Sequence, residues 1–253
     1  MDFAVHFARF AGRQIVSLRT TSRRHKKLDR TDVTDADISI NEDFIQAVTR
    51  REGRRASVIG EELSRRVQRT RRVWTIDPID GTGEYVNDSV PNQRRTTCTG
   101  ICLMHNGVPV LSVVYNPFRV ELFTASRGGQ AQLNGRQIRC SAAALQSGVS
   151  YDYSHWSGSP FDLRNLENRL GRPRGVYSAI YQACEVAAGR SAFAAFPGNT
   201  IHDIAPGSLL VACAGGRVSD LRGEPLRWNN LSRGALYAAP ACHQAAVGLI
   251  AQS

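Results

Sequence analysis

The chain has 253 residues, of which 42% are hydrophobic and 21% charged, and its net charge is +10. This composition supports a substantial buried core and excludes a disordered chain. No run approaches the ~20 consecutive apolar residues that a membrane-spanning helix needs, and the first residues lack the basic and then apolar pattern of a signal peptide. We therefore expect a cytoplasmic protein.

The positive charge is concentrated in the first part of the chain. The first 72 residues hold 17 basic and 10 acidic side chains, and clusters at residues 23–27, 50–55 and 65–72 hold most of the basic ones. Such a surface attracts polyanions, including nucleic acid, and steers small phosphorylated molecules toward the protein. Because no aromatic residues alternate with these basic ones, the sequence favours a small phosphorylated partner over nucleic acid.

The six cysteines are too few for a disulfide framework in a chain of this length. Cys98 and Cys102 lie four residues apart in an alternating segment, and no second pair of this kind exists that could complete a metal site. We expect both to be small residues of the core.

Hydrophobic spacing predicts two helices in the first third of the chain. The first covers residues 3–18, where Phe3, Phe7, Phe10, Ala11 and Val16 recur at helical spacing. A polar basic stretch follows, up to Arg30. A second, amphipathic helix follows the aspartates and threonines of residues 31–37, which suit an N-terminal cap. Its predicted inner face consists of Ile38, Phe44, Ile45 and Val48.

Strands and turns dominate the middle of the chain. Two short strands are predicted at 57–60 and 73–76, and three more between 96 and 123, with turns at Asn106-Gly107 and Asn116-Pro117. Gly128-Gly129 and Asn134-Gly135 mark another hairpin.

The second half alternates between helices and strands. Helices are predicted at 177–188 and 203–214, each followed by a strand, at 192–196 and 217–221. We expect one continuous α/β (α+β) catalytic fold in two lobes, an N-terminal lobe of residues 1–145 with the metal-binding motifs and a C-terminal lobe of residues 146–253.

The most informative segment runs from Trp74 to Tyr85, Trp-Thr-Ile-Asp-Pro-Ile-Asp-Gly-Thr-Gly-Glu-Tyr. Asp77 and Asp80 follow an apolar strand and can converge on one cation. Gly81 lets backbone amides approach an anion closely. Carboxylate oxygens are the ligands that Mg²⁺ prefers.

Further acidic residues lie at the ends of predicted strands and at the starts of predicted helices. Glu61 and Glu62 end the preceding strand, Asp37 lies at a helix start, and Asp203 opens another helix. If these carboxylates gather, each close pair costs about 4 kcal/mol at an effective dielectric constant near 20. Divalent cations remove this repulsion, and such clusters are typical of two-metal phosphoryl chemistry.

The ordered motifs resemble those of the inositol monophosphatase superfamily of magnesium-dependent, lithium-sensitive phosphatases. The family's Gly-Glu-Glu, Asp-Pro-Ile-Asp-Gly-Thr and Trp-Asp-x-Ala-Ala-Gly are similar to Gly60–Glu62, Asp77–Thr82 and His202–Gly207. Shorter similarities extend the resemblance over residues 30–230 and lie at 33–37, 121–135 and 214–216. The resemblance implies a layered αβαβα sandwich of the sugar-phosphatase type.

The resemblance also implies a metal centre with two or three Mg²⁺ ions. Glu61, Asp77 and the carbonyl of Ile79 would hold the first ion. Asp77, Asp80 and Asp203 would hold the second, with Asp77 bridging the two ions. Asp80 and Asp203 would face the substrate as well.

The family resemblance also implies roles for residues around these two ions. Asp37 would support a third, weakly bound ion through water. Thr82, paired with Glu61, would orient the attacking water. The amides of Gly81 and Thr82 would bind phosphate oxygens.

Two departures from the family pattern concern the substrate. Relatives that act on inositol phosphates carry a glutamate seven residues before the last metal-binding aspartate, where this chain has Phe196. His202 replaces the usual tryptophan, and it either contacts the substrate or packs against the helix start. Residues 83–85 and 196–201 are similar to the bisphosphate-nucleotidase branch, whereas residues 121–135 are similar to a bacterial inositol monophosphatase.

We therefore expect a Mg²⁺-dependent phosphatase that hydrolyses a small inositol, polyol, sugar or nucleotide phosphate, and that forms a homodimer as its relatives do. The alternative within the family is a 3′(2′),5′-bisphosphate nucleotidase. The alternative of another class is a weakly catalytic member that binds RNA or a transcription complex through the basic N-terminal half.

Overall fold

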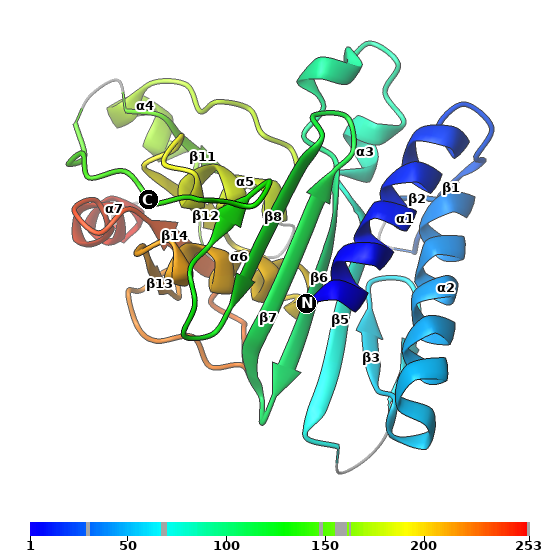
Figure 1. Cartoon of the computed structure of the whole chain (residues 1–253). Coiled ribbons are helices and arrows are strands. Elements are labelled where there is room, and N and C mark those ends of the chain that lie inside the picture. Colours follow the sequence, from blue (N-terminus) through cyan, green and yellow to red (C-terminus); the bar gives the residue numbers. More distant parts are fainter. Residues whose placement is uncertain (29–30, 67–69, 147–148, 155–160, 162, 252–253) are drawn as a thin grey trace.

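The computed structural model describes residues 1–28, 31–66, 70–146, 149–154, 161 and 163–251. Helices and sheets alternate in five layers: α1 and α2, an eight-stranded sheet, α5 and α6, a four-stranded sheet, and α7 (Figure 1). This order confirms the predicted α/β sandwich.

The helices are α1 (Asp2–Leu18), α2 (Asp35–Glu52), α3 (Thr82–Tyr85), α4 (Asn165–Leu170), α5 (Ala179–Ala187), α6 (Ile201–Cys213) and α7 (His243–Ile250), with 3-10 turns η1 (Gly53–Arg55) and η2 (Asn92–Arg94). The strands are β1 (Arg24–Lys26), β2 (Asp32–Thr34), β3 (Val58–Gly60), β4 (Ser64–Arg65), β5 (Arg72–Asp80), β6 (Cys98–His105), β7 (Val108–Asn116), β8 (Glu121–Ser126), β9 (Gln132–Leu133), β10 (Arg136–Gln137), β11 (Tyr151–Tyr153), β12 (Phe193–Phe196), β13 (Arg217–Ser219) and β14 (Ala235–Ala238).

The large sheet has the strand order β10-β9-β8-β7-β6-β5-β3-β4, and of its neighbouring pairs only β3 and β5 are parallel. The predicted strand at 73–76 continues through the acidic motif to Asp80. The pairing of β5 with β6 changes register between Asp77 and Asp80, around Pro78, which has no N–H for the ladder. In a regular strand, side chains three residues apart point to opposite faces. The register shift therefore allows both aspartates to face the same side.

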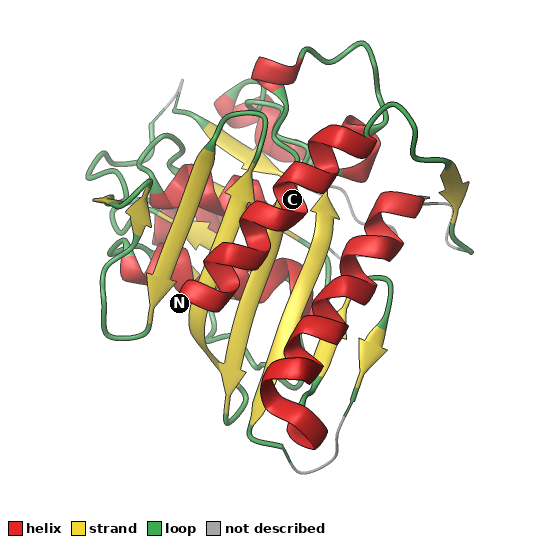
Figure 2. Cartoon of the chain, turned by 45° about the vertical axis from the view of Figure 1, so that its right-hand side comes forward, coloured by secondary structure: helices red, strands yellow, loops and turns green. Residues whose placement is uncertain are grey.

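Helices α1 and α2 lie side by side across one face of this sheet (Figure 2). The buried stripe of α2 contains Ile40, Phe44 and Val48, which recur every four residues. The prediction that Ile38 faces inward is wrong, because position 38 lies about 200° around the helix from position 40. Its side chain is 36% exposed, and that of Val16 in α1 is 51% exposed.

Helices α5 and α6 cover the other face and pack closely against each other. A Cβ atom on Gly207 would come within 2.5 Å of the Ala183 Cβ, and one on Gly100 within 2.4 Å of Ile180 Cδ1. Glycine at these two positions therefore sets the spacing between α6, α5 and the sheet. The predicted core placement of Cys98 and Cys102 is confirmed, since both are fully buried.

The second sheet has the order β11-β12-β14-β13, and it lies between the α5–α6 layer and α7. The sequence prediction missed β11, β14, α4 and α7, as well as the hairpin of β1 and β2. The division into lobes near residue 145 stays a prediction. Among the described residues, no helix is long and apolar enough to cross a membrane.

Candidate active site

Nine of the ten predicted site residues line one cavity of about 690 Å³. They are Glu61, Asp77, Ile79, Asp80, Gly81, Thr82, Phe196, His202 and Asp203. The cavity lies where the ends of β3, β5 and β12 meet the beginning of α6. Residues that are up to 142 positions apart in the chain are thus brought together.

Three buried carboxylates form the centre of this site. Asp77 and Asp80 come from the end of β5 and Asp203 from the first turn of α6, and one carboxylate oxygen of each lies within 4.8 Å of the others. Burial raises the pKa of all three carboxyl groups, and repulsion among the acids of the site adds to the rise, which takes the pKa of Asp80 to about 8. Burial and repulsion thus outweigh the stabilising contacts that these carboxylates have, among them the attraction between His202 and the ionised Asp203.

Neutral donors hold these carboxylates in place. Asp80 accepts hydrogen bonds from Ser178 Oγ at 2.5 Å and from the Ile180 amide at 2.6 Å, at the beginning of α5. Asp203 accepts one from the Thr200 hydroxyl, and Asp77 Oδ1 accepts the Ile79 amide at 3.1 Å. These hydrogen bonds fix the direction of each carboxylate but leave its charge uncompensated.

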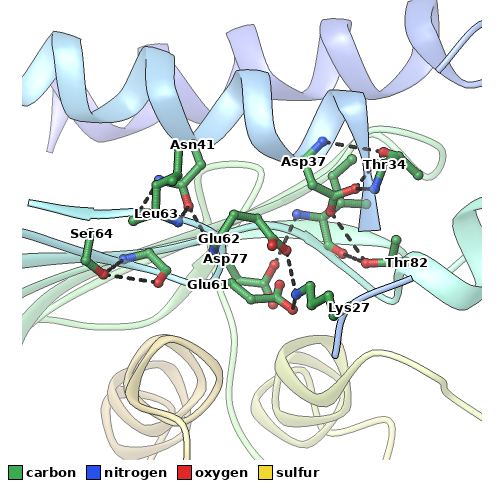
Figure 3. A network of polar contacts seen from close by, with 12 residues as sticks. Lys27, Thr34, Asp37, Asn41, Glu61, Glu62, Leu63, Ser64, Asp77 and Thr82 are labelled. Carbon is green, nitrogen blue, oxygen red and sulfur yellow. Dashed lines mark hydrogen bonds and ion pairs between the residues drawn. The ribbon is translucent and has the colours of Figure 1, made fainter. Parts of the chain in front are cut away.

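Glu61 lies in a turn that is hydrogen-bonded to Asn41 of α2 (Figure 3). Asn41 is fully buried in α2. Its Oδ1 accepts hydrogen bonds from the backbone amides of Glu62 and Leu63, both at 3.2 Å, and its Nδ2 donates one to the Leu63 carbonyl at 3.0 Å. A Cβ atom on Gly60 would lie 2.3 Å from Asn41 Oδ1. The glycine of the Gly-Glu-Glu motif therefore makes room for the side chain that fixes the turn.

Asp37, the tenth predicted residue, lies behind the cavity and does not line it. Its carboxylate accepts hydrogen bonds from the Thr34 amide at 2.8 Å and the Thr34 hydroxyl at 2.6 Å in a capping box at the beginning of α2. Its other oxygen lies 3.5 Å from Thr82 Oγ1 (Figure 3). Burial raises the pKa of Asp37 to about 7. Asp37 thus links the beginning of α2 to Thr82.

The turn at Gly81 and Thr82 is held by the chain around it. Gly81 adopts a left-handed φ of 89°, which favours glycine, and Thr82 Oγ1 donates to the Ile79 carbonyl at 2.8 Å. The buried Glu84 carboxylate accepts the Thr96 amide at 2.7 Å, and the buried Arg95 guanidinium donates to the Asn87 carbonyl at 2.9 Å. The turn is therefore a preformed feature of the fold.

Sequence analysis missed Lys27, which reaches the site from the end of β1. Its Nζ lies 2.6 Å from Glu61 Oε1 and 2.7 Å from Glu62 Oε1 (Figure 3). Burial lowers the pKa of Lys27, but attraction and hydrogen bonds from these two glutamates outweigh it and leave the pKa above its usual value. Lys27 is the only lysine or arginine among the described residues that line the cavity.

The hairpin that presents Lys27 depends on charge pairing. Arg24 of β1 donates to both carboxylate oxygens of Asp32 in β2, at 2.5 and 2.7 Å, and His25 lies 2.7 Å from Asp35. The alternation of basic residues at 23–27 with acids at 32 and 35 was the available signal for this hairpin.

One part of the cavity wall is rich in aromatic and apolar side chains. Tyr153, Val176, Tyr177 and Phe196 contribute to it. Phe196 is only 3% exposed, whereas Tyr177 is 73% exposed. The Gln182 amide group donates to the Val176 carbonyl at 2.7 Å and so holds this part of the wall. The cavity thus combines the acidic cluster with a mainly aromatic part, where the Tyr153 hydroxyl donates a hydrogen bond to Glu167, a further acid of the lining, at 2.6 Å.

The chain belongs to the inositol monophosphatase family, which it matches over residues 2–253. It is 34% identical over 174 residues to Nus factor SuhB of Xylella fastidiosa, covering 66% of this chain and 61% of that protein. It is 34% identical over 206 residues to inositol monophosphatase of Dictyostelium discoideum, covering 76% and 72% of the two chains. The chain therefore spans about three fifths of the SuhB relative's length.

A solved structure agrees with this assignment. The IMPase of Thermotoga maritima superposes on this chain with a TM-score of 0.85 at 26% identity, and the match covers 99% of this chain and 96% of that one. The family resemblance inferred from the motifs is thus confirmed for both fold and family.

The raised pKa values predict how pH affects the metal-free protein. The pKa of Asp80 rises from its ordinary 3.8 to about 8 on folding, so its contribution to the free energy of unfolding is complete below pH 4 and is lost as the pH rises toward 8. We expect the Tm of chelator-treated protein to fall between pH 5 and 8, and Mg²⁺ to raise the Tm more at pH 8 than at pH 5. Thermal unfolding of parent and Asp80→Asn at both pH values measures this.

The Asp80→Asn variant should show a shallower fall, because one of the repelling charges is gone. A metal-free Tm with the same pH dependence in parent and variant would contradict the prediction.

Proposed function

We propose that this protein is a Mg²⁺-dependent phosphomonoesterase that hydrolyses a small phosphorylated molecule. The observation that carries the proposal is the cluster of Asp77, Asp80 and Asp203 beside the preformed turn at Gly81 and Thr82. Membership of the inositol monophosphatase family supports it. Lithium sensitivity and a homodimer remain predictions from the family resemblance, and a cytoplasmic location remains a prediction from the sequence pattern.

The donor set fits a hard divalent cation. Glu61, Asp77 and the Ile79 carbonyl would hold one Mg²⁺, and Asp77, Asp80 and Asp203 a second. All of these donors are oxygens. Burial, together with repulsion among the acids, raises the pKa values of the three aspartates, and a bound cation would stabilise their ionised forms. An IMPase/NADP phosphatase of the same fold has been crystallised with Mg²⁺ and phosphate. When bound, Mg²⁺ compensates the charge of the phosphate and lowers the pKa of a water ligand.

The chain's own residues would orient the nucleophile and the phosphate. Thr82 and Glu61 both line the cavity, so the Thr82 hydroxyl can position a water whose proton Glu61 accepts. The water oxygen would bond to phosphorus while the ester P–O bond breaks, and the leaving oxygen would take up a proton. The amides of Gly81 and Thr82 would bind phosphate oxygens. His202, which lines the same cavity beside Asp203, would face the leaving group.

Lys27 would exchange partners during this reaction. Its ammonium occupies the Glu61 carboxylate that the first cation needs, and an ammonium group can only donate hydrogen bonds. It therefore competes with a cation for Glu61, and a phosphate in the same cavity offers it new acceptors. Asp37 lies behind Thr82, which supports a role in holding Thr82; its role toward a third ion remains a prediction.

The aromatic part of the wall affects which leaving group the cavity favours. Phe196 offers no acceptor for the hydroxyls of an inositol ring, and a site that lacks such a partner discriminates poorly in favour of a hydroxylated ring. An aromatic face packs instead against a base or another apolar surface. The wall therefore favours a nucleotide or other non-inositol phosphate, and adenosine 3′,5′-bisphosphate is the second candidate substrate.

Asp77→Asn should lower phosphate release by more than about 100-fold, since even partners outside the immediate ligand shell contribute 10- to 100-fold. Asp88→Asn is the matched control, because Asp88 is an exposed aspartate that pairs with Arg19. Phosphate release with Mg²⁺, assayed on a panel of monoesters, measures the effect. Turnover of Asp77→Asn within tenfold of the parent would refute the metal assignment.

Lys27→Met should bind Mg²⁺ several-fold more tightly in the absence of phosphate and should lower kcat/KM by about tenfold or more, since a charged hydrogen bond contributes about 1.5–3 kcal/mol. Lys26→Met is the control, because Lys26 is 57% exposed and pairs with Asp32 outside the cavity. Calorimetric titration with MgCl₂ measures the Mg²⁺ affinity, and phosphate-release kinetics measure kcat/KM. Unchanged Mg²⁺ affinity in Lys27→Met would contradict the proposal that Lys27 competes with Mg²⁺ for Glu61.

Phe196→Glu should shift substrate preference toward inositol 1-phosphate, because it restores an acceptor for ring hydroxyls. The measurement is the ratio of kcat/KM for inositol 1-phosphate and adenosine 3′,5′-bisphosphate on parent and variant, with Phe196→Leu as the control for lost volume. If inositol 1-phosphate is the parent's best substrate, the proposed role of the wall is wrong.

A further inference from the structure

The basic charge of this chain is concentrated in two short segments. Residues 44–60 and 63–76 together contain nine arginines and one acid, Glu52. The rest of the chain contains 23 basic and 21 acidic residues and is close to neutral. General arginine richness therefore does not explain the charge of these two segments.

The fold brings the two segments to one end of the molecule. The last turn of α2 and the beginning of β5 lie at this end, at the bottom of Figure 1. The turn η1 directly follows α2, and the pairing of Val58 with both Arg65 and Trp74 places β4 near the beginning of β5. We call their exposed arginines the basic end. They are Arg50, Arg51, Arg54, Arg55, Arg66, Arg71 and Arg72. Arg69 lies outside the described residues.

The charge of the basic end is largely uncompensated. Glu52 is the acid of these segments, and its carboxylate accepts hydrogen bonds from Trp74 Nε1 at 3.0 Å and Arg72 at 3.1 Å. The Glu52 side chain is only 12% exposed. Arg51 lies over the Phe3 ring, 5.1 Å from its centroid, and keeps its charge there. The arginines thus present a positive surface to solvent.

A cleft continues the basic end on the other face of the sheet. Arg71 and Arg72 are neighbours in a strand, so their side chains point to opposite faces. Arg72 contacts Glu52 on the α2 face, whereas Arg71 lines a cleft of about 460 Å³ on the α6 face. Met104, Trp228 and Asn229 line the same cleft. An aromatic ring and an amide group therefore lie beside a cationic surface.

We infer that the basic end and this cleft bind single-stranded nucleic acid. The planar guanidinium groups would hold consecutive phosphates, which they match in geometry. One base would enter the cleft and pack against Trp228, with the Asn229 amide at its edge. A duplex keeps its bases stacked, so it can use the arginines but not the cleft.

A lipid surface fits this end less well. Seven large hydrophobic side chains of the described chain are exposed, and Leu63 is the only one that belongs to the two basic segments. An arginine surface with a single exposed large hydrophobic side chain has little to insert between lipids. The chemistry thus favours a polyanion with bases over an anionic membrane.

The basic end is separate from the phosphatase site. Strand β5 runs from Arg72 at this end to Asp80 in the cavity, about 26 Å at ~3.3 Å per residue. A strand bound at the basic end leaves the cavity open. Binding of nucleic acid at the basic end is therefore independent of the proposed phosphatase reaction. If no nucleic acid binds there, the proposed reaction is unaffected.

The test uses the full chain and a fluorescein-labelled 12-nucleotide oligouridylate, as a single strand and paired with oligoadenylate. The test variant replaces Arg54, Arg55, Arg71 and Arg72 by glutamine. The control replaces Arg136, Arg139, Arg217 and Arg222, which are exposed elsewhere, and removes the same charge. Fluorescence anisotropy over a range of salt concentrations measures affinity.

The test variant should lose at least tenfold in affinity, and its slope of log K against log salt should be smaller by about three, since each phosphate contact on a single strand contributes about 0.7. Trp228→Ala should lower single-strand affinity at least fivefold without changing this slope, and Trp228→Phe should retain most of the affinity. Phosphate release should be unchanged in all variants.

Equal losses in test and control variants would show attraction by net charge alone and would overturn the inference. Equal affinity of the parent for single strand and duplex would overturn the role of the cleft. Binding to anionic vesicles but not to the oligonucleotide would overturn the choice of partner.

Discussion

The electrostatic repulsion among buried carboxylates is the constraint on which the rest of this structure depends. Asp77, Asp80 and Asp203 lie within 4.8 Å of one another, and each close pair of ionised groups costs about 4 kcal/mol at an effective dielectric constant near 20. The donors around them are amides and hydroxyls, which orient the carboxylates without neutralising them. Lys27 brings positive charge only to the edge of the cluster, at Glu61 and Glu62. The fold therefore holds a site that a divalent cation would stabilise.

Three layers of the sandwich, namely α2, the large sheet and the pair of α5 and α6, hold that arrangement. The irregular pairing around Pro78 turns both aspartates of β5 toward the cavity. Helix α2 fixes the turn of Glu61 through Asn41, and the beginning of α5 fixes Asp80 through Ser178. The close contact of Gly207 with α5 sets where α6 presents its first turn. Residues far from the cavity thus determine the distances between its acids.

The parts of the site that could be predicted from the sequence are those encoded by contiguous residues. The strand end with its two aspartates and the following glycine is local chemistry, and the order of the motifs indicated the family. The inward prediction for Ile38 failed because an amphipathic helix has several apolar residues and the packing partner decides which of them are buried.

Features that depend on distant segments could not be predicted in this way. Lys27 reaches Glu61 only because a short hairpin of paired charges folds back over the cavity. The aspartates and threonines before α2 indicated a helix cap, but only the structure shows that Asp37 itself makes the capping bonds to Thr34. Trp228 and Arg71 share a cleft although they come from different halves of the chain. No local pattern relates such residues, because tertiary packing alone brings them together.

The most direct test of the central claim is anomalous diffraction from crystals of this protein grown with Mn²⁺ and phosphate, since Mn²⁺ takes the same oxygen ligands as Mg²⁺. Our account predicts anomalous peaks at about 2.2 Å from carboxylate oxygens of Asp77, Asp80 and Asp203, with the Lys27 ammonium moved away from Glu61. A map with phosphate in the cavity and no metal peak among these three aspartates would contradict it.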